Sequence, residues 1–70
     1  MSIILIEVDQ KKREYYVIKV RPVAQLYLFD RLSIIIEIRE LETKTCKQVW
    51  HLQMTHEGNI IHRHKKYPIN

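Results

Sequence analysis

Cysteine, glycine and alanine each occur once in this 70-residue chain, the first two as Cys46 and Gly58. A single cysteine excludes a disulfide within the chain and provides no zinc-finger spacing. A single glycine excludes a glycine-rich loop that cradles phosphates. The longest apolar runs, such as residues 3–6, hold four residues, whereas a membrane-spanning helix needs about 20. We therefore expect a cytoplasmic protein with no cofactor, no metal and no membrane partner.

Residues that favour β-strands dominate instead, with eleven isoleucines, five valines and four tyrosines. Seventy residues form one domain at most, and a core of that size usually needs a disulfide, a metal or a partner subunit for support. We predict a single β-rich domain over residues 1–67, followed by a short C-terminal tail, 68–70.

Two segments, residues 33–39 and 47–54, alternate with the period of two that marks a half-buried strand. They are expected to form a hairpin that turns at Thr43-Lys44-Thr45. One register gathers their large apolar side chains on one face: it pairs Ile34 with Met54, Ile36 with Leu52 and Ile38 with Trp50.

Two further hairpins flank this one. Residues 2–8 and 14–21 bracket a polar loop, and residues 50–55 and 60–64 bracket the turn at Glu57-Gly58, where glycine can adopt a positive φ. Pro68 should end the last strand, because proline donates no ladder hydrogen bond. In the first hairpin we expect Ile4, Ile6 and Val8 to face Val20, Ile18 and Tyr16.

The segment from Pro22 to Leu32 is ambiguous: it suits a short helix or a short strand before a turn at Asp30-Arg31, and we favour the helix. The predicted fold is a small β-rich domain of about five antiparallel strands in hairpins. One short helix or irregular crossing follows the second strand, so the class is all-β or α+β, and closure into a barrel-like shape is one arrangement.

The first strand is apolar on both faces, which a single sheet with one solvated face does not require. Something is therefore expected to cover the second face, and we predict a homodimer or a docked protein partner. The predicted partner or dimer face consists of Ile3, Leu5, Tyr15, Val17 and Ile35.

The net charge is +4, and basic residues gather in one loop and at the end of the last strand. Cations beside an aromatic ring suit nucleic acid, because charge neutralises phosphate and the ring stacks on a base. The alternative is that these charges only keep a hairpin tip and an edge strand solvated. The candidate nucleic-acid-binding residues are Lys11, Lys12, Arg13, His62, Arg63, His64, Lys65, Lys66 and Tyr67.

Histidines raise two other hypotheses. A tight Glu57-Gly58 turn would place His51 across from His64, near His62, as some metal sites require; surface histidines are the simpler interpretation, and no metal is predicted. His62 and His64, with Lys66, Tyr67 or Arg63, also suit acid–base cleavage of RNA, although we assign no catalytic residue.

The hairpin from Trp50 to His64 also resembles part of a family of small toxins from bacterial toxin–antitoxin pairs, in which an acidic-glycine turn joins two strands before a histidine-containing tail. The family has an Arg-Tyr-Asp-Asn run where this chain has Arg63-His64-Lys65-Lys66.

The leading hypothesis for function is a non-enzymatic nucleic-acid-binding module. A protein-interaction module, acting as an inhibitor or adaptor through an apolar face, is the alternative, and a ribonuclease-like toxin is the third.

Overall fold

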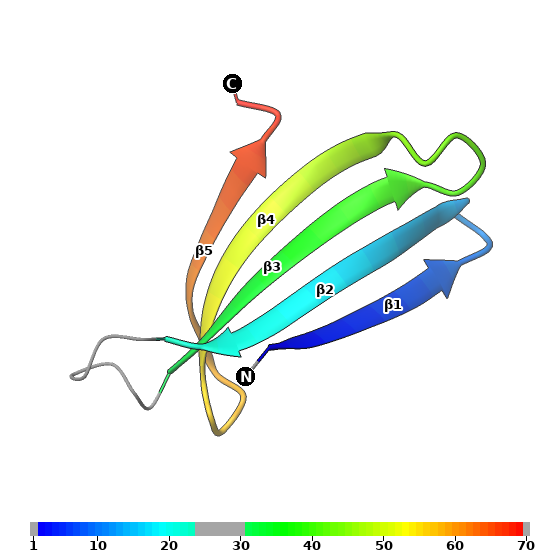
Figure 1. Ribbon diagram of the computed structural model, residues 1–70. Helices are drawn as coiled ribbons and strands as arrows, with labels where there is room; N and C mark the ends of the chain where they lie inside the picture. Colours follow the sequence, from blue (N-terminus) through cyan, green and yellow to red (C-terminus); the bar gives the residue numbers. More distant parts are fainter. Residues whose placement is uncertain (1, 24–30, 70) are drawn as a thin grey trace.

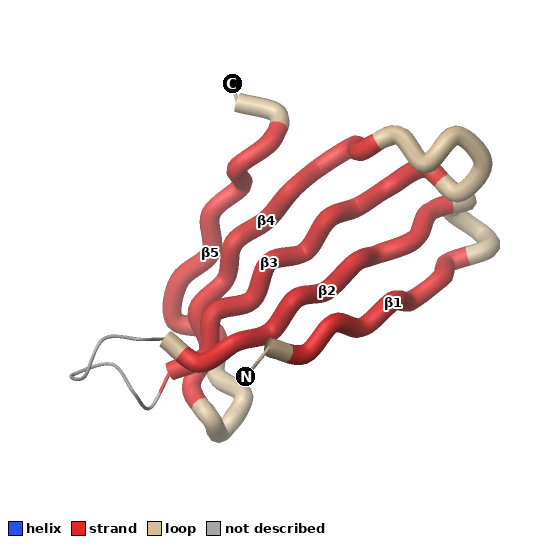
Figure 2. The backbone as a smooth tube through the Cα atoms, in the orientation of Figure 1, coloured by secondary structure: helices blue, strands red, loops and turns tan. Residues whose placement is uncertain are grey.

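The computed structural model describes residues 2–23 and 31–69, which form one antiparallel sheet with strand order β1-β2-β3-β4-β5 (Figure 1). The described residues contain no helix (Figure 2), so none is long and apolar enough to cross a membrane. The predicted five-stranded antiparallel fold is confirmed. The strands are β1 (Ile3–Asp9), β2 (Glu14–Pro22), β3 (Arg31–Glu40), β4 (Cys46–Thr55) and β5 (Ile60–Tyr67).

The sheet is open, so the barrel-like arrangement is wrong. Each strand pairs with the next along the chain, which leaves β1 and β5 as opposite edges (Figure 1). Closure would require these two strands to pair with each other, and among the described residues they do not. The chain accordingly spreads over 41 × 27 × 19 Å.

Both ends of the segment predicted as a helix are strand. Pro22 is the last residue of β2 and pairs with Leu32 at the start of β3. The Val23 amide donates to the Arg31 carbonyl at 3.1 Å, which continues the ladder by one bond. Pro22 is tolerated because it stands at the end of the strand. Residues 24–30, the rest of that prediction, lie outside the described residues.

The β3–β4 hairpin has the predicted faces but a register shifted by two residues. Ile34 pairs with Leu52 and Ile36 with Trp50, so the predicted partners, Met54 and Leu52, are wrong. A shift of two leaves every side chain on its predicted face, which is why alternation alone could not distinguish the two registers. The Glu40 carboxylate fixes the turn, because it accepts hydrogen bonds from the Thr43 amide at 3.1 Å and hydroxyl at 2.8 Å.

The β1–β2 register differs from the prediction by one residue, which exchanges the faces of β1. Ile3 pairs with Val20 and Leu5 with Ile18, whereas Ile4 lies opposite Lys19. Because β1 is apolar on both faces, its pattern did not determine the register. The β1–β2 loop determines the register instead. In this loop Asp9 accepts a hydrogen bond from the Lys12 amide at 3.1 Å, and Arg13 adopts a φ of 55°.

Directly paired residues project to the same side, so these registers define two faces. We call the first the apolar face; its central rows are Ile3–Val20–Ile34–Leu52 and Leu5–Ile18–Ile36–Trp50. We call the other the mixed face; its rows include Ile4–Lys19–Ile35–His51–His64 and Ile6–Val17–Glu37–Val49–Tyr67.

Burial is concentrated at the middle of the sheet. Among the described residues only Ile34 and Leu52 are buried apolar side chains, and Ser33 is the one buried polar residue. Ile3 and Leu5 remain 52% and 50% exposed on the apolar face. The core is therefore one layer of side chains with solvent above it.

The β4–β5 turn depends on Gly58, whose φ is +98°. A Cβ atom there would meet no atom within 4 Å, so an alanine would be strained by backbone conformation alone. We predict that Gly58→Ala lowers the free energy of unfolding by about 1–2 kcal/mol, measured by urea denaturation. His56→Ala, an exposed change in the same turn, is the control and should be close to neutral. Equal stability of the two variants would contradict this account of the turn.

Candidate nucleic-acid interface

The basic residues of β5 divide between the two faces of the sheet. His62 and His64 pair with Gln53 and His51 on the mixed face. Arg63 and Lys65 pair with Leu52 and Trp50, so they end the two central rows of the apolar face. The register shifts by one residue on either side of this stretch, which leaves Lys66 in a bulge between Lys65 and Tyr67. The five consecutive basic positions are therefore two groups that point to opposite sides of the sheet.

Basic side chains from three strands lie near His51. His64 lies directly across from it on β5, and His62 stands two residues earlier on the same strand. Arg21 comes from β2, in the row that continues through Ser33 and Gln53 to His62. We call this group the basic cluster; it consists of Arg21, His51, His62, His64 and Lys66.

His51 occupies the centre of the basic cluster and is held in place by β3. Its Nε2 lies 2.9 Å from the hydroxyl oxygen of buried Ser33, within hydrogen-bond distance. Desolvation by burial lowers the pKa of His51 below its ordinary value, and the nearby charge of Lys66 lowers it further. Weaker repulsions come from the other members, His62, Arg21 and His64. Arg21 and Lys66 therefore place positive potential at His51, and His62 and His64 add to it when they are protonated.

No carboxylate neutralises the basic cluster within the described residues. All four ion pairs found there lie elsewhere, and none includes a residue of β5. The nearest acidic side chain along the mixed face, Glu37, is already paired with Lys19 at 3.3 Å and Arg39 at 2.9 Å. Unneutralised positive charge on a sheet face attracts polyanions.

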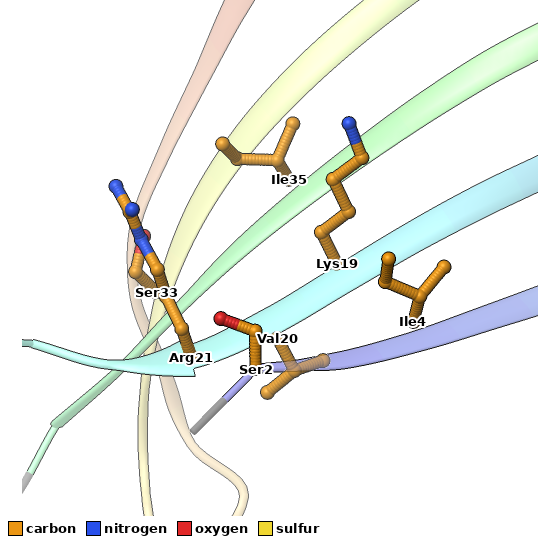
Figure 3. Close-up of a pocket in the computed structure, with 7 residues that line it drawn as sticks. All are labelled: Ser2, Ile4, Lys19, Val20, Arg21, Ser33 and Ile35. Carbon is orange, nitrogen blue, oxygen red and sulfur yellow. The ribbon is translucent and has the colours of Figure 1, made fainter.

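A pocket of about 320 Å³ opens on the β2 side of the cluster (Figure 3). Ile4, Lys19 and Ile35 project to the same side of three neighbouring strands, and Arg21 extends beside Ser33. An apolar floor with cations at its rim suits a planar or aliphatic group that carries negative charge nearby. The remaining lining residues are Ser2 and Val20.

The structure does not bring the two predicted basic segments together. Lys11, Lys12 and Arg13 form the β1–β2 loop at one edge of the sheet, and β5 is the other edge (Figure 1). Arg13 forms an ion pair with Glu42, and its carbonyl accepts from the Leu41 amide at 2.9 Å. Arg13 therefore helps to join two neighbouring loops.

The predicted partner face is also divided. Ile3 and Leu5 lie on the apolar face, whereas Tyr15, Val17 and Ile35 lie on the mixed face. This split follows from the one-residue register difference in β1 described above. The five residues therefore do not form a single docking surface.

The histidines lie as the tight-turn hypothesis required, with His51 directly opposite His64. Among the described residues, however, no three His, Cys, Asp or Glu side chains are grouped so that they could hold one metal ion. The His62 and His64 rings are 6.5 Å apart between centroids and inclined by 24°, so they are nearly parallel.

Sequence reasoning missed Arg21 as a member of the candidate site and considered His51 only as a metal ligand. Both lie far from the basic tail in sequence and join it only through strand pairing. The correct strand registers would have placed Arg21 and His51 beside the basic residues of β5.

Comparisons with family models, with curated proteins and with solved structures found no match to this chain.

The lowered pKa of His51 predicts a pH-dependent stability. Well above pH 6.5 the side chain is neutral in the folded and unfolded states alike. As the pH falls below 6.5, the unfolded chain binds the proton first, so the free energy of unfolding decreases until His51 also protonates in the fold. Relative to His51→Gln, the wild-type protein should lose stability between pH 7.5 and pH 5 in urea titrations. Parallel pH profiles for the two proteins would contradict the assignment.

Proposed function

We propose that this protein is a small non-enzymatic nucleic-acid-binding module that acts in the cytoplasm. The observation that carries the proposal is the convergence of Arg21, His62, His64 and Lys66 around His51, with no carboxylate beside them in the described part of the chain. A polyanion with regularly spaced phosphates supplies the missing negative charge. The free thiol of half-buried Cys46 is compatible with a reducing compartment.

Single-stranded nucleic acid is the form that the cluster suits best. The His62 and His64 rings are nearly parallel, and each offers an imidazole face on which a base can stack. Tyr67, half exposed on the same strand, offers another stacking surface. A duplex keeps its bases stacked inside and cannot use these rings. The loop residues Lys11 and Lys12 are exposed at the opposite edge and provide a second, separate contact for a longer strand.

A protein-interaction module is the second candidate, because β1 exposes apolar side chains on the mixed face. Ile4 and Ile6 are 63% and 66% exposed, and they adjoin Val17 and Ile35. In that case, replacing both β1 isoleucines by glutamine would abolish partner binding and leave oligonucleotide binding intact.

Fluorescence anisotropy with labelled single-stranded DNA, single-stranded RNA and duplex DNA, at two salt concentrations, tests the leading proposal. We predict that the double variant Arg21→Gln, Lys66→Gln weakens single-strand binding about tenfold or more. It should also reduce the magnitude of the salt slope by roughly 1.4, or about 0.7 for each lost phosphate contact.

The matched control is Lys11→Gln, Lys12→Gln, which removes the same charge from the β1–β2 loop. It should weaken the binding of short oligonucleotides much less than the cluster variant does. Equal losses for the two variants would show that only net charge matters, and absence of binding at low salt would remove the proposal. Shortening of the RNA during the titration would instead support the ribonuclease-like toxin.

A further inference from the structure

The protein exposes more surface than an isolated domain of its mass. A chain of 8.6 kDa is expected to expose about 4,700 Å² when folded alone, whereas this one exposes 5537 Å². The excess, roughly 800 Å², matches what each partner buries in a protein–protein interface of standard size. Exposed apolar side chains lie on both sides of β1: Ile3 and Leu5, about half exposed, on the apolar face, and Ile4, Ile6 and Val8 on the mixed face.

The apolar face, and not the mixed face, is the one that suits burial. The centre of the mixed face carries the Lys19–Glu37–Arg39 ion pairs and the basic cluster, and burying these charges would be costly. The central rows of the apolar face contain only uncharged side chains between β1 and β4. Its charges lie at the rim. Glu7 stands on β1, and Arg63 and Lys65 stand on β5. The row Asp9–Glu14–Glu40 closes one end of the face, where Glu14 pairs with Lys47 at 2.7 Å.

The rim charges of β1 and β5 are opposite in sign. If a second copy lies face to face with its two-fold axis parallel to the strands, β1 of each chain lies over β5 of the other. Acidic Glu7 then stands within one row of the partner's Lys65, at both rims of the interface. A two-fold axis perpendicular to the strands would set β5 over β5 and oppose Lys65 to its own copy. Neither Glu7 nor Lys65 has an ion-pair partner among the described residues.

We propose that the apolar face binds a second copy of this chain, forming a two-layer sandwich in which β1 of each copy lies over β5 of the other. Two sheets packed in this way keep their strands roughly aligned and bury the inner side chains of both. Both basic clusters then remain on the outer surfaces of the dimer, available to a polyanion. The dimer does not depend on the proposed function, because its residues lie on the other side of the sheet.

Analytical ultracentrifugation of the full chain, from 1 to 100 µM, tests the proposal. We expect the mass of two chains, and we expect the single changes Glu7→Lys and Lys65→Glu each to raise the dimer dissociation constant at least tenfold. The double variant, which exchanges the two charges, should return the constant to within about threefold of the wild-type value. Circular dichroism of each variant confirms that the sheet is retained.

The rescue by charge exchange separates a specific interface from loss of folding, because an unfolded variant cannot regain the dimer through a second substitution. A one-chain mass at 100 µM with an intact β spectrum would overturn the proposal. A dimer that withstands both single reversals would overturn the β1-over-β5 arrangement.

Discussion

The constraint on which this structure depends is that a single layer of strands cannot bury its own side chains. Ile34 and Leu52 occupy the centre of five strands, and they alone among the described apolar side chains are buried. In a protein with two packed layers, the second layer covers the apolar face of the first. Here backbone pairing holds the strands in order, and the described residues provide no second layer over the apolar face. The proposed dimer would supply that layer, and the marginal size of the chain would make it important for stability.

The two faces of the sheet differ in chemistry. The central rows of the apolar face carry isoleucine, leucine, valine and tryptophan between β1 and β4. The mixed face carries ion pairs near Glu37 and unneutralised cations near His51. β5 contributes to both, because alternate side chains of its basic stretch project to opposite sides. One strand can thus supply rim charge for a dimer and phosphate contacts for a ligand.

Much of the fold could be predicted from the sequence, because alternation and turn residues are local signals. Gly58 and the paired threonines at 43 and 45 mark two of the turns correctly. Register was harder to predict. Shifting β4 by two residues preserves its faces, and β1 is apolar on both faces, so only loop contacts such as those of Asp9 and Glu40 select the pairing.

The candidate site was less predictable for the same reason. The basic tail was visible as a run of letters, but the run is divided by strand geometry into two groups. Arg21 and His51 join one of those groups through three successive strand pairings, and no local pattern marks them. The loop cations, which resemble the tail in composition, lie at the opposite edge of the sheet. Composition identified the charges, whereas topology decided which of them act together.

The central claim is that a polyanion binds where the positive potential converges on His51. The most direct measurement is an NMR titration of the His51 ring with and without a saturating single-stranded oligonucleotide. The account predicts a pKa below 6.5 in the free protein and a higher pKa in the complex, because phosphates nearby favour the charged imidazole. Binding that leaves the pKa of His51 unchanged would contradict the account and place the ligand elsewhere on the molecule.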